Sequence, residues 1–329
     1  MSASGLPFDD IRNLLPQLPP SSDVCVEEVR VRGADLLASP ASLGRLQEIN
    51  EWLAAWQGKS RPTVMRPLVA VFAASHGAHA KGIAPAPASQ ARKMLEALAA
   101  GGGAVNQVCA TFDVGLKVFE LAIDIPTHDV TLDEGALDEA ACAATFAFGM
   151  EAIAGGTDLL VLGDLGVGSN VIAAGIAHAL YGGAPKDWAP TGANAQALGV
   201  IAEAVAKHGH QRDPLELMRR LGGREIAAIA GAIIAARIER IPVLLDGYVA
   251  ASAAALLYAL NPNTIDHCMA ASVSPHAGHR ALLAKIGKTP LLDLGLDLED
   301  GTGGALAVGI VKAALAAHRD MATRTQAGL

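Results

Sequence analysis

Short apolar runs alternate with longer stretches of helical periodicity from residue 68 onward. The apolar runs are 68–74, 117–124, 158–163 and 242–246, and the predicted helices are 89–99, 137–154, 170–180, 213–221 and 224–237. Continuous apolar strands that alternate with helices are typical of a parallel sheet with helices on both faces. The pattern therefore predicts an α/β fold built on a Rossmann-like parallel sheet.

The two ends of the chain have a helical pattern instead. Apolar residues recur at spacings of three and four from Leu43 to Leu53, with Ser42 as the predicted N-cap, and residues 305–318 form a predicted last helix. We find no linker that would separate independent domains. The predicted parts are an N-terminal helical lobe (1–62), an α/β core (63–300) and a C-terminal helix that returns to the lobe (301–329).

Composition narrows the choice of partners. The chain carries 25 Lys and Arg against 33 Asp and Glu, a net charge of −8, so we expect no nucleic-acid partner. The longest apolar helical runs, 226–236 and 247–260, are shorter than the roughly 20 residues that span a bilayer, so we expect no membrane segment. The first residues contain no basic stretch followed by an apolar one, which predicts a cytoplasmic protein without a signal peptide.

The four cysteines predict reduced thiols. Cys25, Cys109, Cys142 and Cys268 are scattered along the chain without a CxxC pair. This spacing argues against both a disulfide framework and a zinc site.

Three unusual loops stand where ligands bind in open α/β sheets, at the carboxyl ends of strands. Ser75-His76-Gly77 follows the first apolar run, Gly163–Asn170 follows the third, and Glu299–Gly304 precedes the last helix. No G-x-S-x-G elbow accompanies Ser75 and His76, so they are not read as a nucleophile and its base.

The glycines of the later two loops have two interpretations. Gly163, Gly166 and Gly168 would let backbone N–H groups approach a phosphate at a helix N-terminus, but a tight turn capped by Ser169 or Asn170 needs the same glycines. Gly301-Thr302-Gly303 could likewise hold an anion or simply start a capped helix. The sequence alone leaves both alternatives open.

Two pairs of histidines resemble metal ligands in their spacing. His208 and His210, and His276 and His279, lie in glycine-containing loops without a third matching ligand. We therefore predict no metal site.

Long segments over nearly the whole chain resemble the nicotinate-nucleotide:dimethylbenzimidazole phosphoribosyltransferase family. They read SLGRLQEINEWLAAWQG, RPLVAVFAASHG, AAGGGAVNQVC, AFGMEAIAGGTDLLVLGDLGVG, DPLELMRRLGGREIAAIAGAIIAARIERIPVLLDGYVA and PLLDLGLDLEDGTGGALA. The resemblance implies a homodimer whose core binds nicotinate mononucleotide and a benzimidazole-type base and needs no other cofactor. It implies transfer of phosphoribose to 5,6-dimethylbenzimidazole or a related base, with inversion, giving α-ribazole 5′-phosphate and nicotinate in cobalamin biosynthesis.

The family's catalytic glutamate lies in a G-E-G-[TS]-G motif, and here Asp300 matches it while Glu299 replaces the preceding glycine. The resemblance implies that Asp300 accepts the azole proton, with Glu299 as a substitute. A carboxylate suits this step because it also stabilises a developing oxocarbenium ion.

Other family positions are also changed. The family's G-E-M-G-I-G-N-T-T loop matches 163–171, so its acid becomes Asp164, and its V-T-A-Q-M segment matches 90–94, which puts Lys93 in place of glutamine. Its S-x-E-P-G-H segment becomes Ser274–His279, and its K-P-x-G-S-L-G stretch becomes Ala38–Gly44. The implied substrate-binding residues are Ser75, His76, Lys93, Gly163, Asp164, Gly166, Gly168, Ser169, Asn170, Gly301, Thr302 and Gly303.

Two functional hypotheses follow. The retained scaffold, glycine loops and acid at the base position favour a working pentosyltransferase with an altered base preference. The changes clustered at ligand loops favour the alternative, a non-catalytic paralogue that binds a nucleotide or partners a true transferase.

Overall fold

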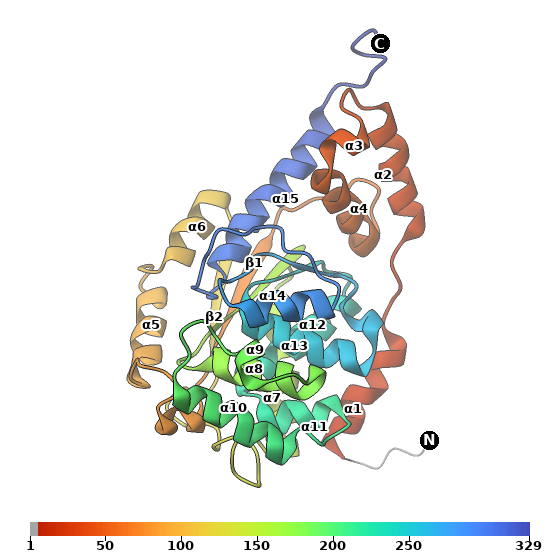
Figure 1. The fold of residues 1–329 in the computed structure, drawn as a ribbon. Coiled ribbons are helices and arrows are strands. Elements are labelled where there is room, and N and C mark those ends of the chain that lie inside the picture. Colours follow the sequence, from red (N-terminus) through yellow and green to blue (C-terminus); the bar gives the residue numbers. More distant parts are fainter. Residues whose placement is uncertain (1–5) are drawn as a thin grey trace.

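The computed structural model describes residues 6–329 and contains a five-stranded sheet in the order β2-β1-β3-β4-β5 (Figure 1). All neighbouring strands are parallel. The strands are β1 (Pro67–Ala73), β2 (Gly115–Glu120), β3 (Leu159–Leu165), β4 (Val243–Leu245) and β5 (Cys268–Ala270). The predicted α/β class with a parallel sheet is confirmed.

Helices connect the strands and cover both faces of the sheet. They are α1 (Pro7–Leu14), α2 (Asp23–Asp35), α3 (Pro40–Leu43), α4 (Arg45–Gln57), α5 (Ser89–Ala99), α6 (Ala104–Phe112), α7 (Glu139–Met150), α8 (Ser169–Tyr181), α9 (Pro185–Trp188), α10 (Ala195–His208), α11 (Pro214–Leu221), α12 (Arg224–Ile238), α13 (Gly247–Leu260), α14 (Ala277–Lys285) and α15 (Thr302–Asp320).

Successive side chains of the central strands enter two separate cores, as strand geometry requires. Leu68 and Phe72 of β1 pack with α7, α8, α12 and α13. Val69 and Val71 pack with α5, α6 and α15 on the other face. Because both faces are covered, β1 and β3 are buried throughout, and apart from Gly163 and Asp164 their residues are continuously apolar instead of alternating, as the sequence pattern indicated.

Glycine allows the closest helix pair, α7 against α12. A Cβ added at Gly149 would lie 1.9 Å from the carbonyl oxygen of Ala228, and one at Gly231 would lie 1.9 Å from that of Phe146. The two backbones therefore touch, which explains part of the small-residue bias of the chain.

A small lobe of α2, α3 and α4 stands beside the core and is joined to it by α15 (Figure 1). Asn50 of α4 donates to the carbonyl of Ala314, and the Nε2 atom of His318 lies 3.2 Å from the carbonyl of Val29 in α2. Helix α1 packs on α7 of the core instead, and the N–H of Phe8 donates to Glu139. The division at residues 62 and 300 stays a proposal, and residues 1–5 of the predicted lobe lie outside the described residues.

Some local predictions were wrong. Ser42 does not cap the helix of 43–53, because it belongs to α3, which Ser39 caps, and α4 starts after Gly44. Strand β5 was missed because three residues give too short a pattern. The predicted helix 137–154 ends at Met150 and continues as a 3₁₀ turn.

Two further features bear on earlier expectations. Among residues 6–329, no helix combines the length and apolar character needed to cross a membrane. Cys109, Cys142 and Cys268 are buried and Cys25 is half-buried, each with a free thiol.

Candidate active site

A cavity of about 390 Å³ opens at the carboxyl ends of β1 and β3. Its lining comes from the segment before α5, from α5 itself, from the β3–α8 junction and from the loop before α15: Ala84, Ala86, Gln90, Ala91, Met94, Asp164, Leu165, Gly166, Val167, Gly168, Ser169, Asn170, Asp297, Leu298 and Glu299. In the strand order 2-1-3-4-5, β2 lies on one side of β1, and β3, β4 and β5 follow on its other side. The order in which the chain adds strands therefore reverses between β1 and β3. Ligands of such sheets bind at this reversal.

The start of α8 forms one wall of the cavity. β3 ends at Leu165, and Gly168 has the left-handed φ of 89° that ends the turn before Ser169. No side chain caps this helix, so the first N–H groups of α8 keep their capacity to bind an anion. A Cβ at Gly168 would lie 2.8 Å from Cδ1 of Ile83.

The start of α15 has similar glycines, but side chains of the protein itself lie against them. The carboxylate of Asp246 accepts from the hydroxyl of Ser272 and lies against the backbone of Gly303 and Gly304. A Cβ at Gly303 would lie 2.5 Å from an oxygen of Asp246. The protein's own carboxylate thus takes the place of an external anion, and the Gly301-Thr302-Gly303 segment does not line the cavity.

Glu299 is the most unusual acid on the cavity wall. It is 7% exposed and has a φ of 58°, a left-handed conformation that a side chain rarely adopts. Neither of its carboxylate oxygens makes a hydrogen bond of good geometry within residues 6–329, although the backbone N–H of Tyr248 and the side chain of Ser274 lie close enough to lower its pKa in part. Burial, followed by the nearby Asp164, raises its pKa well above the usual value. Strained backbone and an unpaired buried acid together mark functional positions.

Asp300 is held in a different way. Its Oδ1 atom accepts from the backbone N–H of Thr302 at 3.1 Å and from the Thr302 hydroxyl at 2.5 Å. Its side chain is buried and outside the cavity lining. These contacts are those of a carboxylate that caps the start of α15.

Asp164, the residue before the last one of β3, lines the cavity. Its side chain is buried, and its Oδ2 atom has no hydrogen-bond partner in the described part of the chain. Burial and then Glu225 raise its pKa well above the usual value. Asp164 also raises the pKa of Glu299, so without a ligand the site disfavours two negative charges.

Helix α5 forms the opposite wall with Gln90, Ala91 and Met94. These positions share one helix face because they lie one, three and four residues apart. Lys93, a predicted substrate ligand, is exposed and lies outside the lining. The sequence prediction chose Lys93 because it replaces the family's glutamine, whereas the helical periodicity of 89–99 would have selected Gln90 and Met94.

Three other predicted ligands lie beneath the cavity surface. Ser75 is buried, and His76 is fully buried with its Nε2 atom 3.3 Å from Glu225. Burial lowers the pKa of His76 to about 4 and raises that of Glu225 to about 7, which favours a neutral pair. Gly163 allows the loop before α15 to approach β3, because a Cβ there would lie 2.5 Å from the N atom of Gly301.

His276 joins the site from the start of α14. Its Nδ1 atom accepts from the N–H of Thr191 at 3.2 Å, and its Nε2 atom lies 2.9 Å from an oxygen of Asp297. A neutral ring with Nδ1 as acceptor carries its proton on Nε2 and donates it to Asp297. Potential ligand atoms of His276, Asp297 and Glu299 also lie within 4.8 Å of one another, the one group in residues 6–329 with the spacing of a metal site.

The remaining histidines that resemble metal ligands do not converge. His208 bonds to the carbonyl of Leu132, and His279 bonds to Ser274.

Sequence reasoning missed Asp246, Asp297, Gln90 and Met94. Asp246 follows directly after an apolar run and was therefore detectable, whereas Asp297 lies in a loop without a local signal.

Comparisons with known proteins show the family to which the chain belongs. Residues 18–329 match the family model described as "Phosphoribosyltransferase". The chain is 56% identical over its full length to the nicotinate-nucleotide–dimethylbenzimidazole phosphoribosyltransferase of Rhizobium johnstonii and 57% identical to that of Brucella melitensis, covering 99% of each. A solved structure of the Thermus thermophilus enzyme of that name superposes with a TM-score of 0.86 at 31% identity, covering 93% of this chain and 98% of the other.

Proposed function

The chain belongs to this phosphoribosyltransferase family, as its sequence motifs indicated, and we propose that it transfers phosphoribose from nicotinate mononucleotide to 5,6-dimethylbenzimidazole or a related base. The products are nicotinate and α-ribazole 5′-phosphate, an intermediate of cobalamin biosynthesis. The observation that carries the proposal is the cavity at the β1–β3 reversal, where an open helix start faces unpaired buried acids in a chain related to these enzymes over its full length.

The start of α8 suits the nucleotide phosphate. Gly166, Gly168, Ser169 and Asn170 all line the cavity, and the helix has no side-chain cap that would compete with a ligand. The partial positive charge of a helix N-terminus favours an anion. The base would then lie toward α5, against Gln90 and Met94.

The reaction replaces one bond to C1′ of the ribose with another. The bond between C1′ and the nicotinate nitrogen breaks, and its electron pair neutralises the pyridinium ring. A nitrogen of the benzimidazole forms the new bond from the opposite face, and its second nitrogen loses a proton. The protein has to accept that proton and stabilise the positive charge that develops at C1′.

We assign the base role to Glu299 in preference to Asp300. Glu299 lines the cavity with both oxygens unpaired, whereas an oxygen of Asp300 is bonded twice to Thr302. A raised pKa makes Glu299 a stronger base once it is ionised. The pyridinium charge of nicotinate mononucleotide favours ionisation, because an opposite charge nearby lowers the pKa of a carboxyl group.

Separate variants test the reaction and the assignment. Purified protein is incubated with nicotinate mononucleotide and dimethylbenzimidazole, and products are followed by chromatography. We expect Glu299→Gln to lower kcat by about 100-fold or more, because general base catalysis typically contributes a factor of this size. Asp300→Asn should lower kcat by less than about tenfold, because Asp300 does not take the proton. The opposite ranking would assign the base to Asp300.

The parent protein decides between enzyme and non-catalytic paralogue. If the parent binds nicotinate mononucleotide by calorimetry but forms product no faster than buffer, the transferase proposal fails. The paralogue hypothesis then becomes the better account of the altered loops.

We also retain two predictions about the whole protein: a symmetric homodimer and a cytoplasmic location. Light scattering that gives the mass of one chain at micromolar concentration would contradict the dimer. Cell fractionation tests the location.

A further inference from the structure

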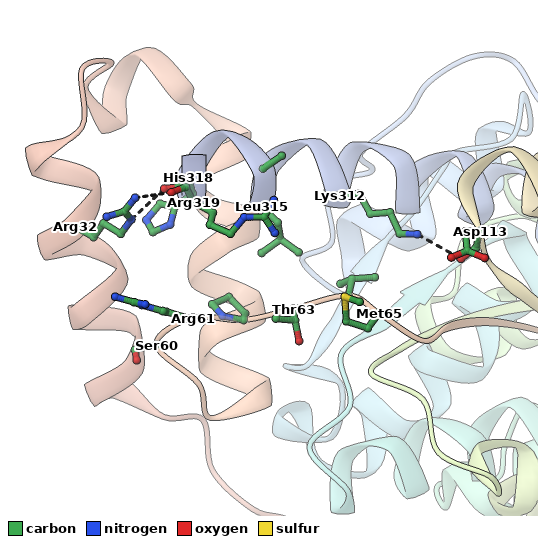
Figure 2. A pocket seen from close by; sticks show the side chains of 13 residues that line it. Arg32, Ser60, Arg61, Thr63, Met65, Asp113, Lys312, Leu315, His318 and Arg319 are labelled. Atoms are coloured by element: carbon green, nitrogen blue, oxygen red, sulfur yellow. Dashed lines mark hydrogen bonds between the residues drawn. The ribbon is translucent and has the colours of Figure 1, made fainter. Parts of the chain in front are cut away.

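A larger cavity, of about 510 Å³, lies at the amino ends of the strands, away from the candidate active site. Its walls come from α2, from the segment that leads into β1, from the turn before β2 and from the last turns of α15: Arg32, Ser60, Arg61, Pro62, Thr63, Val64, Met65, Asp113, Lys312, Leu315, Ala316, His318 and Arg319 (Figure 2). The start of α15 borders the active site, and Lys312 lies ten residues further along it. At 1.5 Å per residue, the two sites are roughly 15 Å apart or more along this helix.

Within residues 6–329, three cations of this cavity form no ion pair with a carboxylate. Arg32 donates to the carbonyls of His318 and Arg319, and Lys312 donates to those of Phe112 and Asp113. Arg61 is exposed, and no contact within the described chain neutralises its charge. Bonds to carbonyls fix the direction of a cationic side chain but leave its positive charge intact.

The other charged groups do not cancel this excess. Arg319 is paired with Asp320 at 2.7 Å, and burial lowers the pKa of His318, so it adds no charge at neutral pH. Asp113 is the one acid in the lining. It lies beside Lys312, whereas Arg32 and Arg61 lie with Ser60 at the other end of the cavity (Figure 2). At that end Arg32, Arg61 and Arg319 face the single carboxylate of Asp320, whose pKa Arg319 and Arg32 both lower, so an excess of positive charge remains in a chain with a net charge of −8.

We propose that this cavity binds a phosphorylated small molecule, with its phosphate between Arg32 and Arg61. Guanidinium groups bind phosphate oxygens through paired hydrogen bonds, and the hydroxyls of Ser60 and Thr63 add donors. Val64, Met65 and Leu315 supply an apolar wall for the rest of the ligand. The volume lies within the range of small-molecule sites.

Inorganic pyrophosphate is a suitable probe for the phosphate end. Calorimetry is performed on the full chain saturated with nicotinate mononucleotide, so that the anion site at α8 is filled. We expect one pyrophosphate to bind per chain. Absence of binding under these conditions would overturn the proposal.

Charge reversal locates the site. Arg61→Glu should weaken pyrophosphate binding by about tenfold or more, because it replaces an attractive charge with a repulsive one inside the cavity. Lys59→Glu is the matched control: Lys59 is exposed, lies two residues away and does not line the cavity, so the same change in net charge should alter affinity less than about twofold. Equal losses in the two variants would show a general field effect and contradict a site at Arg61.

A second copy of the chain could occupy the same surface. In that case the parent binds no pyrophosphate, and Arg61→Glu changes the mass measured by light scattering while Lys59→Glu does not. That result would also overturn the proposal.

Discussion

The starts of α8 and α15 share a glycine-rich sequence but differ in what their N–H groups meet. Gly166-Val167-Gly168 precedes α8, where no side chain caps the helix and the turn lines the cavity. At the start of α15, around Gly301-Thr302-Gly303, the carboxylate of Asp246 lies against the backbone and Asp300 accepts from the N–H of Thr302. The same pattern therefore builds an uncapped helix start on the cavity wall at α8, which we propose for the nucleotide phosphate, and an internally capped start at α15.

The difference shows that glycines at a helix start indicate that another group lies close to the backbone. They do not indicate whether that group is a ligand or a side chain of the protein. At α15 the glycines admit Asp246 and Val161: a Cβ at Gly304 would lie 2.1 Å from Val161. At α8, Gly168 faces Ile83 and the cavity. Only the identity of the neighbour separates a ligand site from a packing site.

The largest expected effect is on nucleotide binding at the start of α8. Gly168→Val should weaken binding of nicotinate mononucleotide by about a thousandfold or more, because a β-branched residue is strained at a φ of 89° and its side chain enters the turn. Calorimetry on folded protein measures this loss. Gly182→Val is the control: Gly182 has a φ of 71° at the far end of α8, with nothing within 4 Å of an added Cβ. Unchanged affinity in Gly168→Val would remove the phosphate from this turn.

Removal of the internal cap should act on stability first. Asp246→Ala removes the acceptor of the buried Ser272 hydroxyl and the carboxylate that lies against Gly303 and Gly304, and we expect a loss of roughly 3 kcal/mol in the free energy of unfolding. Urea denaturation measures it. If instead the variant keeps its stability and binds phosphate at α15, the two helix starts are equivalent and the distinction between them is wrong.

The buried acids between the two starts predict a dependence on pH. The raised pKa of Glu299 means that the folded protein keeps a proton that the unfolded chain releases above its ordinary pKa of 4.5. Stability of the unliganded protein should therefore fall as the pH rises from about 5 to 8. Glu299→Gln, which carries no charge at any pH, should have a smaller fall and a Tm a few degrees above the parent at pH 8. A parallel fall in both proteins would mean that Glu299 is ionised in the empty site.

The smallest expected effects come from the first residue of each helix. Ser169→Ala should weaken binding of nicotinate mononucleotide by about three- to tenfold, the effect of one hydrogen bond, and should also cost about 1 kcal/mol of stability because the hydroxyl donates to the carbonyl of Gly166. Thr302→Val should act on stability alone, because its hydroxyl bonds to Asp300 and Thr302 does not line the cavity. It should cost about 1 kcal/mol of stability and leave affinity unchanged. Calorimetry measures the affinity of both variants for nicotinate mononucleotide, and urea denaturation measures their stability.

The sequence by itself determined the α/β class, the parallel sheet and the family. Apolar runs such as 68–74 identify strands buried on both faces, since no other common element is both short and apolar throughout. Helices with strong periodicity, such as 89–99, were placed correctly to the residue. Local pattern suffices for these features because they depend on the period and length of hydrophobic segments.

Only the tertiary structure decided how the acids and glycines differ in their surroundings. Glu299 and Asp300 are neighbours in the chain, yet one lies unpaired on the cavity and the other caps α15. Lys93 is exposed, whereas Gln90 and Met94 on the same helix line the cavity. Asp246 and Gly303 lie 57 residues apart and meet only because β4 ends where α15 begins. The physical reason is that burial, pairing and pKa depend on contacts between segments distant in sequence, and local periodicity carries no record of those contacts.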